Sequence, residues 1–398
     1  MNIKSLLLGS AAALVAVSGA RAADAIIAAE PEPVEYVRVC DAFGTGYFYI
    51  PGTETCLRIH GYVRYDIGAG DLFAMTSGTG EETYFKRARF SFRVSTASET
   101  ELGTLRTYVE SRWQYDANGA SNAAWNAPNS LRGYTNDNEF TVNFAWIQLG
   151  GLRVGKDESL FTTFTGYAGN VINDGSYGPF DTNLISYTYN NGAFRAAIGV
   201  EEGVSNTFNT VTGATTGWGI DDYMPHVVAG VGYNAGMFDL SAVVGYDTRD
   251  DWTTPGGTGN ALLGILPTAP ALQVVGGWAA KLRADVTLSD QASLFVMAMY
   301  GENSSAYTTW ANGLATDETW SVIGGGSYQA TDKVTLNAQV QWIESNIAAN
   351  SDAWSVVGNL NYTVVPGLVV TPEFVYADSG VAGTDGEFGF YGRVQRSF

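Results

Sequence analysis

The stretch that decides the fold is residues 57–67, which read LRIHGYVRYDI. Its odd-numbered positions carry leucine, isoleucine, glycine, valine and tyrosine, whereas its even-numbered positions carry arginine, histidine, tyrosine and aspartate. A repeat of two residues places alternate side chains on opposite faces of a β-strand. The stretch therefore predicts a strand with one small or apolar face and one polar face that is rich in cations.

The same alternation returns along most of the chain. Apolar side chains again alternate with charged or amide side chains in residues 87–94, 105–113, 278–286 and 333–342. Two runs depart from the pattern, because residues 140–149 change parity near Ala145, and Met297 and Met299 occupy polar positions. A β-bulge or a different strand boundary would explain each departure.

Two kinds of connection separate the alternating runs. Seven are short: Thr96–Leu102, Gly150-Gly151, Asn191-Gly192, Ala235-Gly236, Thr287–Gln291, Ala330–Asp332 and Pro366-Gly367. Eight are long and rich in Gly, Asn, Thr and Asp: residues 69–82, 115–137, 157–182, 202–222, 247–272, 302–317, 344–352 and 378–384. The two kinds alternate strictly, so the connections join sixteen strands. An even strand number, with short turns at one end and long loops at the other, is typical of an outer-membrane β-barrel.

The first 22 residues have the pattern of a secretory signal peptide. Lys4 supplies the positive end, residues 6–17 form an apolar core, and Ala20-Arg21-Ala22 matches an Ala-x-Ala cleavage site. The apolar core is too short to span a hydrocarbon layer of roughly 30 Å, which argues against an uncleaved anchor helix. We therefore expect the leader to be removed and the mature chain to begin at Ala23.

We expect a periplasmic N-terminal segment over residues 23–56 and a barrel domain over residues 57–398. The two cysteines of the chain, Cys40 and Cys56, fall in the N-terminal segment. An exported, oxidising setting favours a disulfide between them over two free thiols. A metal site is not expected, because the chain has only two histidines and no second cysteine pair.

Composition narrows the class of protein. Without the leader the chain has 19 basic and 40 acidic residues, and such a chain is not expected to bind nucleic acid. A soluble β-sandwich would also alternate, but its outer face would carry scattered lysine and glutamate, and the chain has five lysines. Several apolar faces end in Trp, Tyr or Phe, as expected at a lipid–water boundary. A transmembrane barrel is therefore favoured over a sandwich.

Three segments resemble the alphaproteobacterial porin family, the Omp2-type general porins of Brucella and Rhizobiales. They are residues 36–65 (YVRVCDAFGTGYFYIPGTETCLRIHGYVRY), residues 145–156 (AWIQLGGLRVGK) and residues 392–398 (GRVQRSF). The resemblance covers the mature chain and implies a trimeric barrel of the bacterial outer membrane whose third long loop folds inward. It also implies an assembly signal at Phe398 and passive diffusion of small hydrophilic solutes and ions through a water-filled channel. We accordingly expect outer-membrane lipid and lipopolysaccharide around a homotrimer.

The polar faces of the early strands carry the candidate site residues. Neighbouring strands lie about 4.8 Å apart, so seven arginines are expected to form a basic wall: Arg58, Arg64, Arg87, Arg89, Arg93, Arg106 and Arg112. The third long loop offers four facing acids: Asp157, Glu158, Asp174 and Asp181. We interpret wall and loop as the borders of a constriction. The alternative is that the arginines pair with Glu110 and Asp66 and only stiffen the wall.

Other functions find less support. The chain has no Gly-x-Ser-x-Gly, His-Glu-x-x-His or Walker motif, and we expect neither an enzyme nor a cofactor. A second hypothesis is a sugar-selective outer-membrane channel, with Tyr62, Tyr108 and Tyr391 as dispersed aromatic contacts. A third is a secreted carbohydrate-binding β-protein, which would dissolve without detergent.

Overall fold

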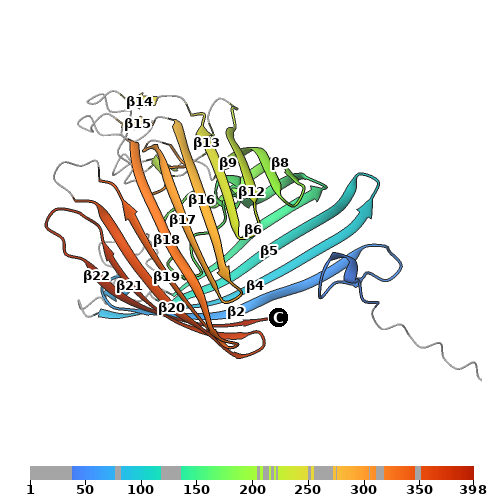
Figure 1. Ribbon diagram of the computed structural model, residues 1–398, viewed down its shortest axis with the longest axis horizontal. Helices are drawn as coiled ribbons and strands as arrows, with labels where there is room; N and C mark the ends of the chain where they lie inside the picture. Colours follow the sequence, from blue (N-terminus) through green and yellow to red (C-terminus); the bar gives the residue numbers. More distant parts are fainter. Residues whose placement is uncertain are drawn as a thin grey trace, which may run out of the picture. The chain divides into compact units, whose positions relative to one another are not determined.

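The architecture comes from a computed structural model that describes residues 38–76, 82–117, 136–203, 207–208, 215–216, 219–220, 223–249, 252–254, 272–274, 276–303, 305–310, 318–345 and 351–398. The predicted leader and residues 23–35 lie outside these ranges. Residues 40–398 form one unit. Within its described part, sixteen antiparallel strands pair in sequence order, and the last pairs with the first (Figure 1). The sheet therefore closes into the predicted barrel, in which no strand edge is left open.

The barrel strands are β2 (Cys56–Ala69), β4 (Glu82–Thr100), β5 (Gly103–Ala117), β6 (Asn136–Leu149), β7 (Leu152–Glu158), β8 (Asp181–Asn190), β9 (Phe194–Gly203), β12 (His226–Asn234), β13 (Phe238–Asp247), β16 (Gly277–Ser289), β17 (Ala292–Glu302), β18 (Glu318–Thr331), β19 (Val334–Ile343), β20 (Ala353–Val365), β21 (Leu368–Asp378) and β22 (Glu387–Ser397). The smaller elements are η1 (Asp41–Phe43), β1 (Phe48–Tyr49), β3 (Ala74–Thr76), α3 (Leu160–Thr163), β10 (Thr207–Phe208), β11 (Thr215–Thr216), β14 (Trp252–Thr254) and β15 (Leu272–Val274). No helix among the described residues is long and apolar enough to cross a membrane.

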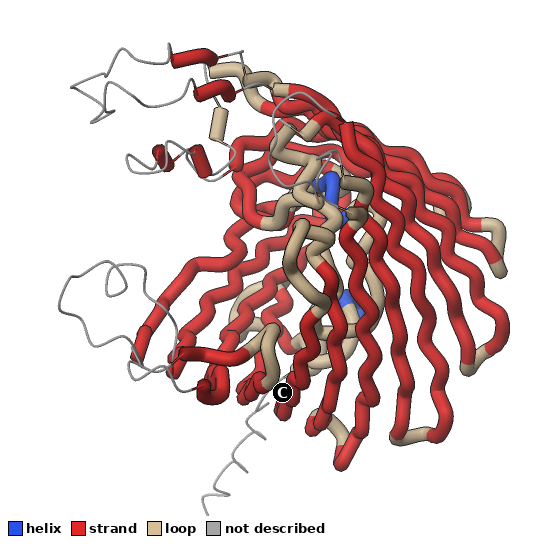
Figure 2. The backbone as a smooth tube through the Cα atoms, turned by 90° about the vertical axis from the view of Figure 1, so that its left-hand side faces the viewer, coloured by secondary structure: helices blue, strands red, loops and turns tan. Residues whose placement is uncertain are grey.

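Short hairpin turns lie together at one end of the barrel (Figure 2). All seven turns predicted from the sequence connect paired strands in the described chain. Gly192 and Gly367 have φ angles of 94° and 81° in two of them, a region that favours glycine. The longer connections leave the strands at the opposite end, so the strand count and the two-sided loop pattern are both confirmed.

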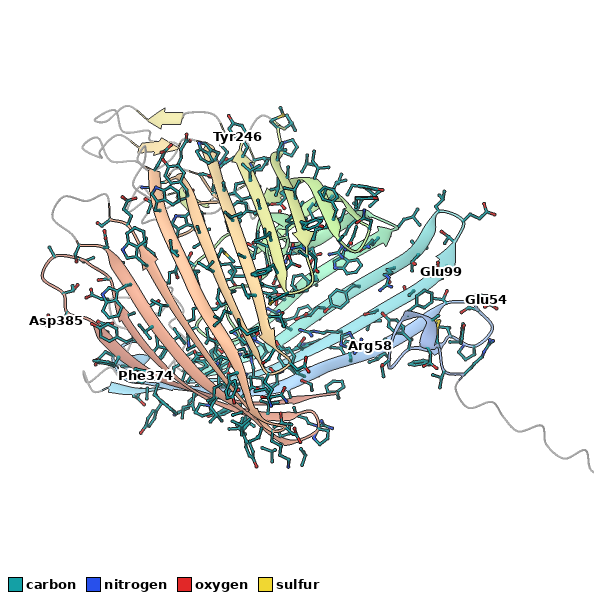
Figure 3. All side chains as sticks on the ribbon, viewed as in Figure 1. Glu54, Arg58, Glu99, Tyr246, Phe374 and Asp385 are labelled. Carbon is teal, nitrogen blue, oxygen red and sulfur yellow. A yellow bond between two sulfur atoms is a disulfide. The ribbon has the colours of Figure 1, made fainter. Side chains whose placement is uncertain are left out.

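The two faces of the barrel wall follow the predicted parity. On β19, Leu336 and Val340 point outward and are 42% and 48% exposed, whereas Gln339 on the inner face is 1% exposed. Figure 3 shows the outward-pointing side chains along the strands, among them Tyr246 and Phe374. The apolar face is thus turned away from the barrel interior, as a lipid-facing surface requires.

Both departures from alternation have a structural cause. The β5–β6 ladder shifts its register so that Glu110 pairs with Phe144 and Ser111 with Val142, which leaves Asn143 as a bulge. The bulge reverses the parity of β6 and turns Phe144 inward, where it is 9% exposed. Met297 and Met299 do face inward, and both are fully buried in an apolar cluster inside the barrel.

The third loop, residues 159–180, supplies four of the buried residues of that cluster. Ser159 caps the short helix α3 by accepting a hydrogen bond from the Phe161 amide at 3.1 Å. Phe161 and Tyr177 of this loop pack inside the barrel with Met297 and Met299, and neither ring is more than 1% exposed. Apolar contacts therefore hold the loop against one inner wall, and the loop folds inward as the family resemblance implies.

Candidate pore constriction

The seven predicted arginines lie on the inner parity of β2, β4 and β5. The ladders place them in neighbouring rows, with Arg64 opposite Arg89 and His60 opposite Arg93. Arg58 sits on β2 close to the disulfide-closed loop that carries Glu54 (Figure 3). The strands thus bring these cations together on one inner wall, which we call the arginine wall.

Three carboxylates neutralise part of this charge. Glu110 lies 2.9 Å from Arg93 and 2.6 Å from Arg112, and its side chain is fully buried. Asp116 pairs with Arg87 at 2.8 Å, and Asp66 lies 3.3 Å from Arg64. Arg58, Arg89 and Arg106 form no ion pair with any described residue, so the arginine wall keeps an excess of positive charge. The arginine wall therefore contains ion pairs that stiffen it and also arginines that keep their positive charge.

Arg393 of β22 belongs to the same wall and was not predicted. Its Nε lies 2.7 Å from the buried carboxylate of Asp66. Because a closed barrel sets the last strand beside the first, the pairing of Asp66 with Arg393 follows from the ladder. Barrel closure and the parity of residues 391–395 were the signals that could have identified it.

The four predicted acids flank the third loop more than they lie in it. Asp157 and Glu158 end β7, and Asp181 begins β8, so only Asp174 belongs to the loop. Asp157 pairs with Arg153 at 2.5 Å, and Asp181 pairs with Lys156 at 2.8 Å.

Tyr167 connects the loop to these strand ends. Its hydroxyl donates a hydrogen bond to Glu158. Burial and that bond raise the pKa of the Tyr167 phenol, while the charge of Arg112 acts in the opposite direction. Arg112 therefore lies within electrostatic reach of the loop.

Hydrogen bonds from the far wall fix the tip of the loop. The buried carboxylate of Glu373 accepts bonds from the amides of Ile172 and Asn173 at 2.5 and 2.9 Å. The side chain of Gln339 accepts a hydrogen bond from the Gly169 amide at 2.6 Å and donates one to the Asp174 carbonyl at 2.7 Å. The loop thus crosses from β7 to the wall of β19 and β21, which narrows the barrel at that depth.

A second inward segment supports the base of the loop. Tyr307, in the connection between β17 and β18, packs its ring 5.0 Å from that of Phe161. Its hydroxyl donates to Glu201 at 3.2 Å, and the same carboxylate accepts bonds from Ser159 Oγ and the Leu160 amide at 2.7 and 2.5 Å. The loop is therefore braced at both its base and its tip.

Asp174 makes the loop sensitive to pH. Burial raises the pKa of its carboxyl to about 6, although the Tyr177 hydroxyl donates to it at 2.6 Å. A folded-state pKa above the usual value of about 3.9 means that the group stabilises the loop most below pH ~4. That contribution is lost as pH rises through about 6, where the buried carboxyl ionises.

We expect Asp174→Asn to remove this pH dependence, because the amide oxygen still accepts the Tyr177 hydroxyl but cannot ionise. Current noise from loop movement in planar bilayers should increase between pH 4 and 7 in the parent and stay flat in the variant. Asp385→Asn, in an exposed loop, is the control. An unchanged pH profile in Asp174→Asn would count against the argument.

A cavity of about 1170 Å³ lies beside the third loop, toward the short turns. Three further arginines line it, and each pairs with an aspartate at 2.5–2.7 Å: Arg153 with Asp157, Arg195 with Asp239 and Arg283 with Asp285. These pairs were not singled out from the sequence, although Arg283 and Asp285 occupy polar positions of an alternating strand. This cavity is therefore lined by ion pairs that carry charges of both signs.

Two of the three predicted tyrosine contacts are covered, whereas Tyr108 is half-buried and stacks 5.4 Å from Trp146. Tyr62 and Tyr391 are 7% and 6% exposed. Guanidinium groups lie over their rings, with Arg64 5.3 Å from the Tyr62 centroid and Arg393 6.0 Å from that of Tyr391. A sugar slide needs accessible ring faces, so this arrangement does not favour the sugar-channel hypothesis.

The disulfide and the chain terminus both attach to β2. Cys40 and Cys56 are bonded, as predicted. Phe398 exchanges two backbone hydrogen bonds of 3.0 Å with Gly61, and its ring faces outward and stacks on Phe90. No cluster of His, Cys, Asp and Glu in the described residues could hold a metal ion.

Comparison with known proteins places the chain. A family model described as a porin subfamily matches residues 24–389. The chain belongs to this porin subfamily. Porin Omp2b of Brucella suis biovar 1 (strain 1330) is 49% identical to this porin over 356 residues, which cover 88% of each chain.

Solved structures agree on the fold. The outer membrane channel DcaP of Acinetobacter baumannii aligns with a TM-score of 0.59 at 17% identity, covering 88% of this porin and 99% of that chain. The trimer form of OmpT of Vibrio cholerae aligns with a TM-score of 0.53 at 11% identity, covering 87% and 100%.

Family and fold together define the general function. The protein is a porin of the bacterial outer membrane that forms a water-filled channel for passive diffusion of small hydrophilic solutes and ions. Membership of this subfamily implies a channel rather than an enzyme.

Proposed function

We propose that the narrowest part of the channel lies between the arginine wall and the third loop, and that this constriction gives the porin a weak ionic preference. The proposal is carried by the excess of arginine over carboxylate on the wall. The loop supports it from the other side, since both its base and its tip are bound to the barrel.

The electrostatic field of the arginine wall is of the size expected for a weakly selective diffusion channel. Two unit charges 10 Å apart in water interact by about 0.4 kcal/mol, and salt with a Debye length of about 8 Å reduces this further. One charge therefore changes the local concentration of a monovalent ion by roughly twofold at most. Several aligned charges produce a preference without a tight binding site.

We also propose the assembly that the family implies. The porin is a homotrimer, surrounded by lipid and lipopolysaccharide, whose residues 1–22 are removed on export and whose Phe398 serves as an assembly signal. The trimeric form described for OmpT of Vibrio cholerae, which shares the fold, supports the trimer. The ring of Phe398 faces outward and is 55% exposed, which leaves it open to contact by another protein.

Neutralising part of the arginine wall tests the constriction. In the variant Arg89→Gln/Arg93→Gln, the ratio of anion to cation permeability should fall roughly two- to fourfold, because two positive charges leave the lumen. Reversal potentials in planar bilayers under a salt gradient measure it. Arg396→Gln, at an exposed position next to a turn, is the control. An unchanged reversal potential would reject the arginine wall as a determinant of selectivity.

A further inference from the structure

Tyr62 lies at the centre of the arginine wall. It stands on the inner face of β2 and is only 7% exposed. The guanidinium carbons of Arg64 and Arg93 lie 5.3 and 5.2 Å from the centroid of its ring. One neutral ring is thus shared by two cations from neighbouring strands, a contact in which the ring quadrupole attracts each charge.

The carboxylates beside these two arginines are occupied by other groups. Asp66 accepts hydrogen bonds from Arg393 at 2.7 and 3.3 Å. Glu110 accepts them from Arg112 at 2.6 Å and from Ser91 at 3.1 Å. Arg393 and Arg112 are therefore the arginines that these carboxylates bind best.

Arg64 and Arg93 pair with the same two carboxylates, but in poorer hydrogen-bond geometry. Their Nε atoms lie 3.3 Å from Asp66 and 2.9 Å from Glu110. Neither Nε makes a hydrogen bond of ordinary geometry within the described chain. The ring of Tyr62 is thus a second contact that both guanidiniums make beside these carboxylates.

A ring and a carboxylate hold a cation with different results for the pore. A carboxylate that also accepts a hydrogen bond cancels the charge most completely, as at Arg153, which lies 4.1 Å over Trp146 and donates to Asp157 at 2.5 Å. An uncharged ring holds the guanidinium and leaves its charge intact. Arg64 and Arg93 share one such ring, beside ion pairs that lack hydrogen-bond geometry at Nε.

We infer that Tyr62 is a positioning residue for ion selectivity, which keeps the charges of Arg64 and Arg93 directed into the lumen. The inference rests on the proposed constriction and deepens it. Without the ring, the two guanidiniums would turn toward Asp66 and Glu110 and lose part of their effect on passing ions. The positive excess of the arginine wall is thus set by an aromatic residue as well as by the number of arginines.

Replacement of the ring tests the inference. In Tyr62→Leu, the ratio of anion to cation permeability should fall about 1.5- to 2-fold, less than in Arg64→Gln/Arg93→Gln, because the cations are redirected and not removed. Tyr62→Phe keeps the ring and should restore the parent value. Tyr65→Leu, on the outer face of the same strand, is the matched control. Reversal potential in planar bilayers is the readout, with heat-dependent gel mobility to show that each barrel has folded.

A triple variant distinguishes a role of Tyr62 in positioning the two arginines from a simple change in the shape of the pore. Tyr62→Leu should cause no further shift in a chain that already carries Arg64→Gln/Arg93→Gln, since its targets are absent. An equal shift in that background would overturn the inference, and so would an unchanged potential in Tyr62→Leu when the arginine substitutions do shift it. If the arginine substitutions themselves have no effect, the proposed constriction fails first. Should Tyr62→Leu not assemble, Tyr62→Met, which is flexible and has no ring, replaces it with the same expected shift.

Discussion

Glu373→Ala is expected to release the tip of the third loop and to give large current fluctuations in single channels. The carboxylate of Glu373 is 1% exposed and accepts bonds from two loop amides and from Asn173 Nδ2 at 2.7 Å. Hydrogen bonds to a charged group contribute about 1.5–3 kcal/mol each. Even a combined loss of about 3 kcal/mol, less than the sum of the three bonds, would raise the population of released loop by roughly 150-fold.

The barrel itself should survive this substitution, because its sixteen ladders do not depend on the loop. Single-channel recording at fixed voltage and pH is the measurement. Glu373→Gln, which keeps one acceptor oxygen, should lie between parent and Ala variant. Glu387→Ala, at the exposed start of β22, should behave as the parent does. Recordings of Glu373→Ala that match the parent would show that apolar packing alone holds the loop.

Leu282→Arg should destabilise the barrel by about 2–4 kcal/mol, the cost of an arginine facing lipid at the bilayer midplane. Leu282 lies near the middle of β16, faces outward and is 58% exposed. The same substitution at Leu288, which is 57% exposed at the end of this strand, should cost about 0–1 kcal/mol. The two side chains are almost equally exposed, but they are expected to lie at different depths in the bilayer.

Denaturant unfolding from lipid vesicles measures both variants. The difference between them is the informative quantity, because a soluble protein would tolerate arginine equally well at two exposed leucines. Equal, small losses of stability at Leu282 and Leu288 would therefore contradict a lipid-facing outer surface. A loss only at Leu282 would locate the hydrocarbon layer along β16.

The number of strands and the outward direction of their apolar face could be predicted from local sequence. Both follow from patterns that recur along the chain, namely the two-residue alternation of side chains and the alternation of short and long connections. Gly150-Gly151 and Pro366-Gly367 mark hairpins because few other residues suit such turns. The parity change in β6 was visible, but only the ladder assigns the bulge to Asn143.

The path of the third loop could not be predicted in the same way. Its course depends on contacts with residues about 200 positions away, such as Glu373, and no local period encodes these. Met297 and Met299 carry a signal of another kind, because apolar residues on an inner face indicate that another segment packs there. The role of Tyr62 likewise required the distances between strands.

The seam between β2 and β22 has a practical meaning for work with this porin. Phe398 is itself one of the paired residues at that seam, through its two bonds with Gly61. An affinity tag appended to the carboxyl end would start directly from the joint that completes the ring, and a deletion there would remove a partner from the first strand. Labels and purification handles belong instead at residues 381–385, an exposed connection that takes no part in any ladder.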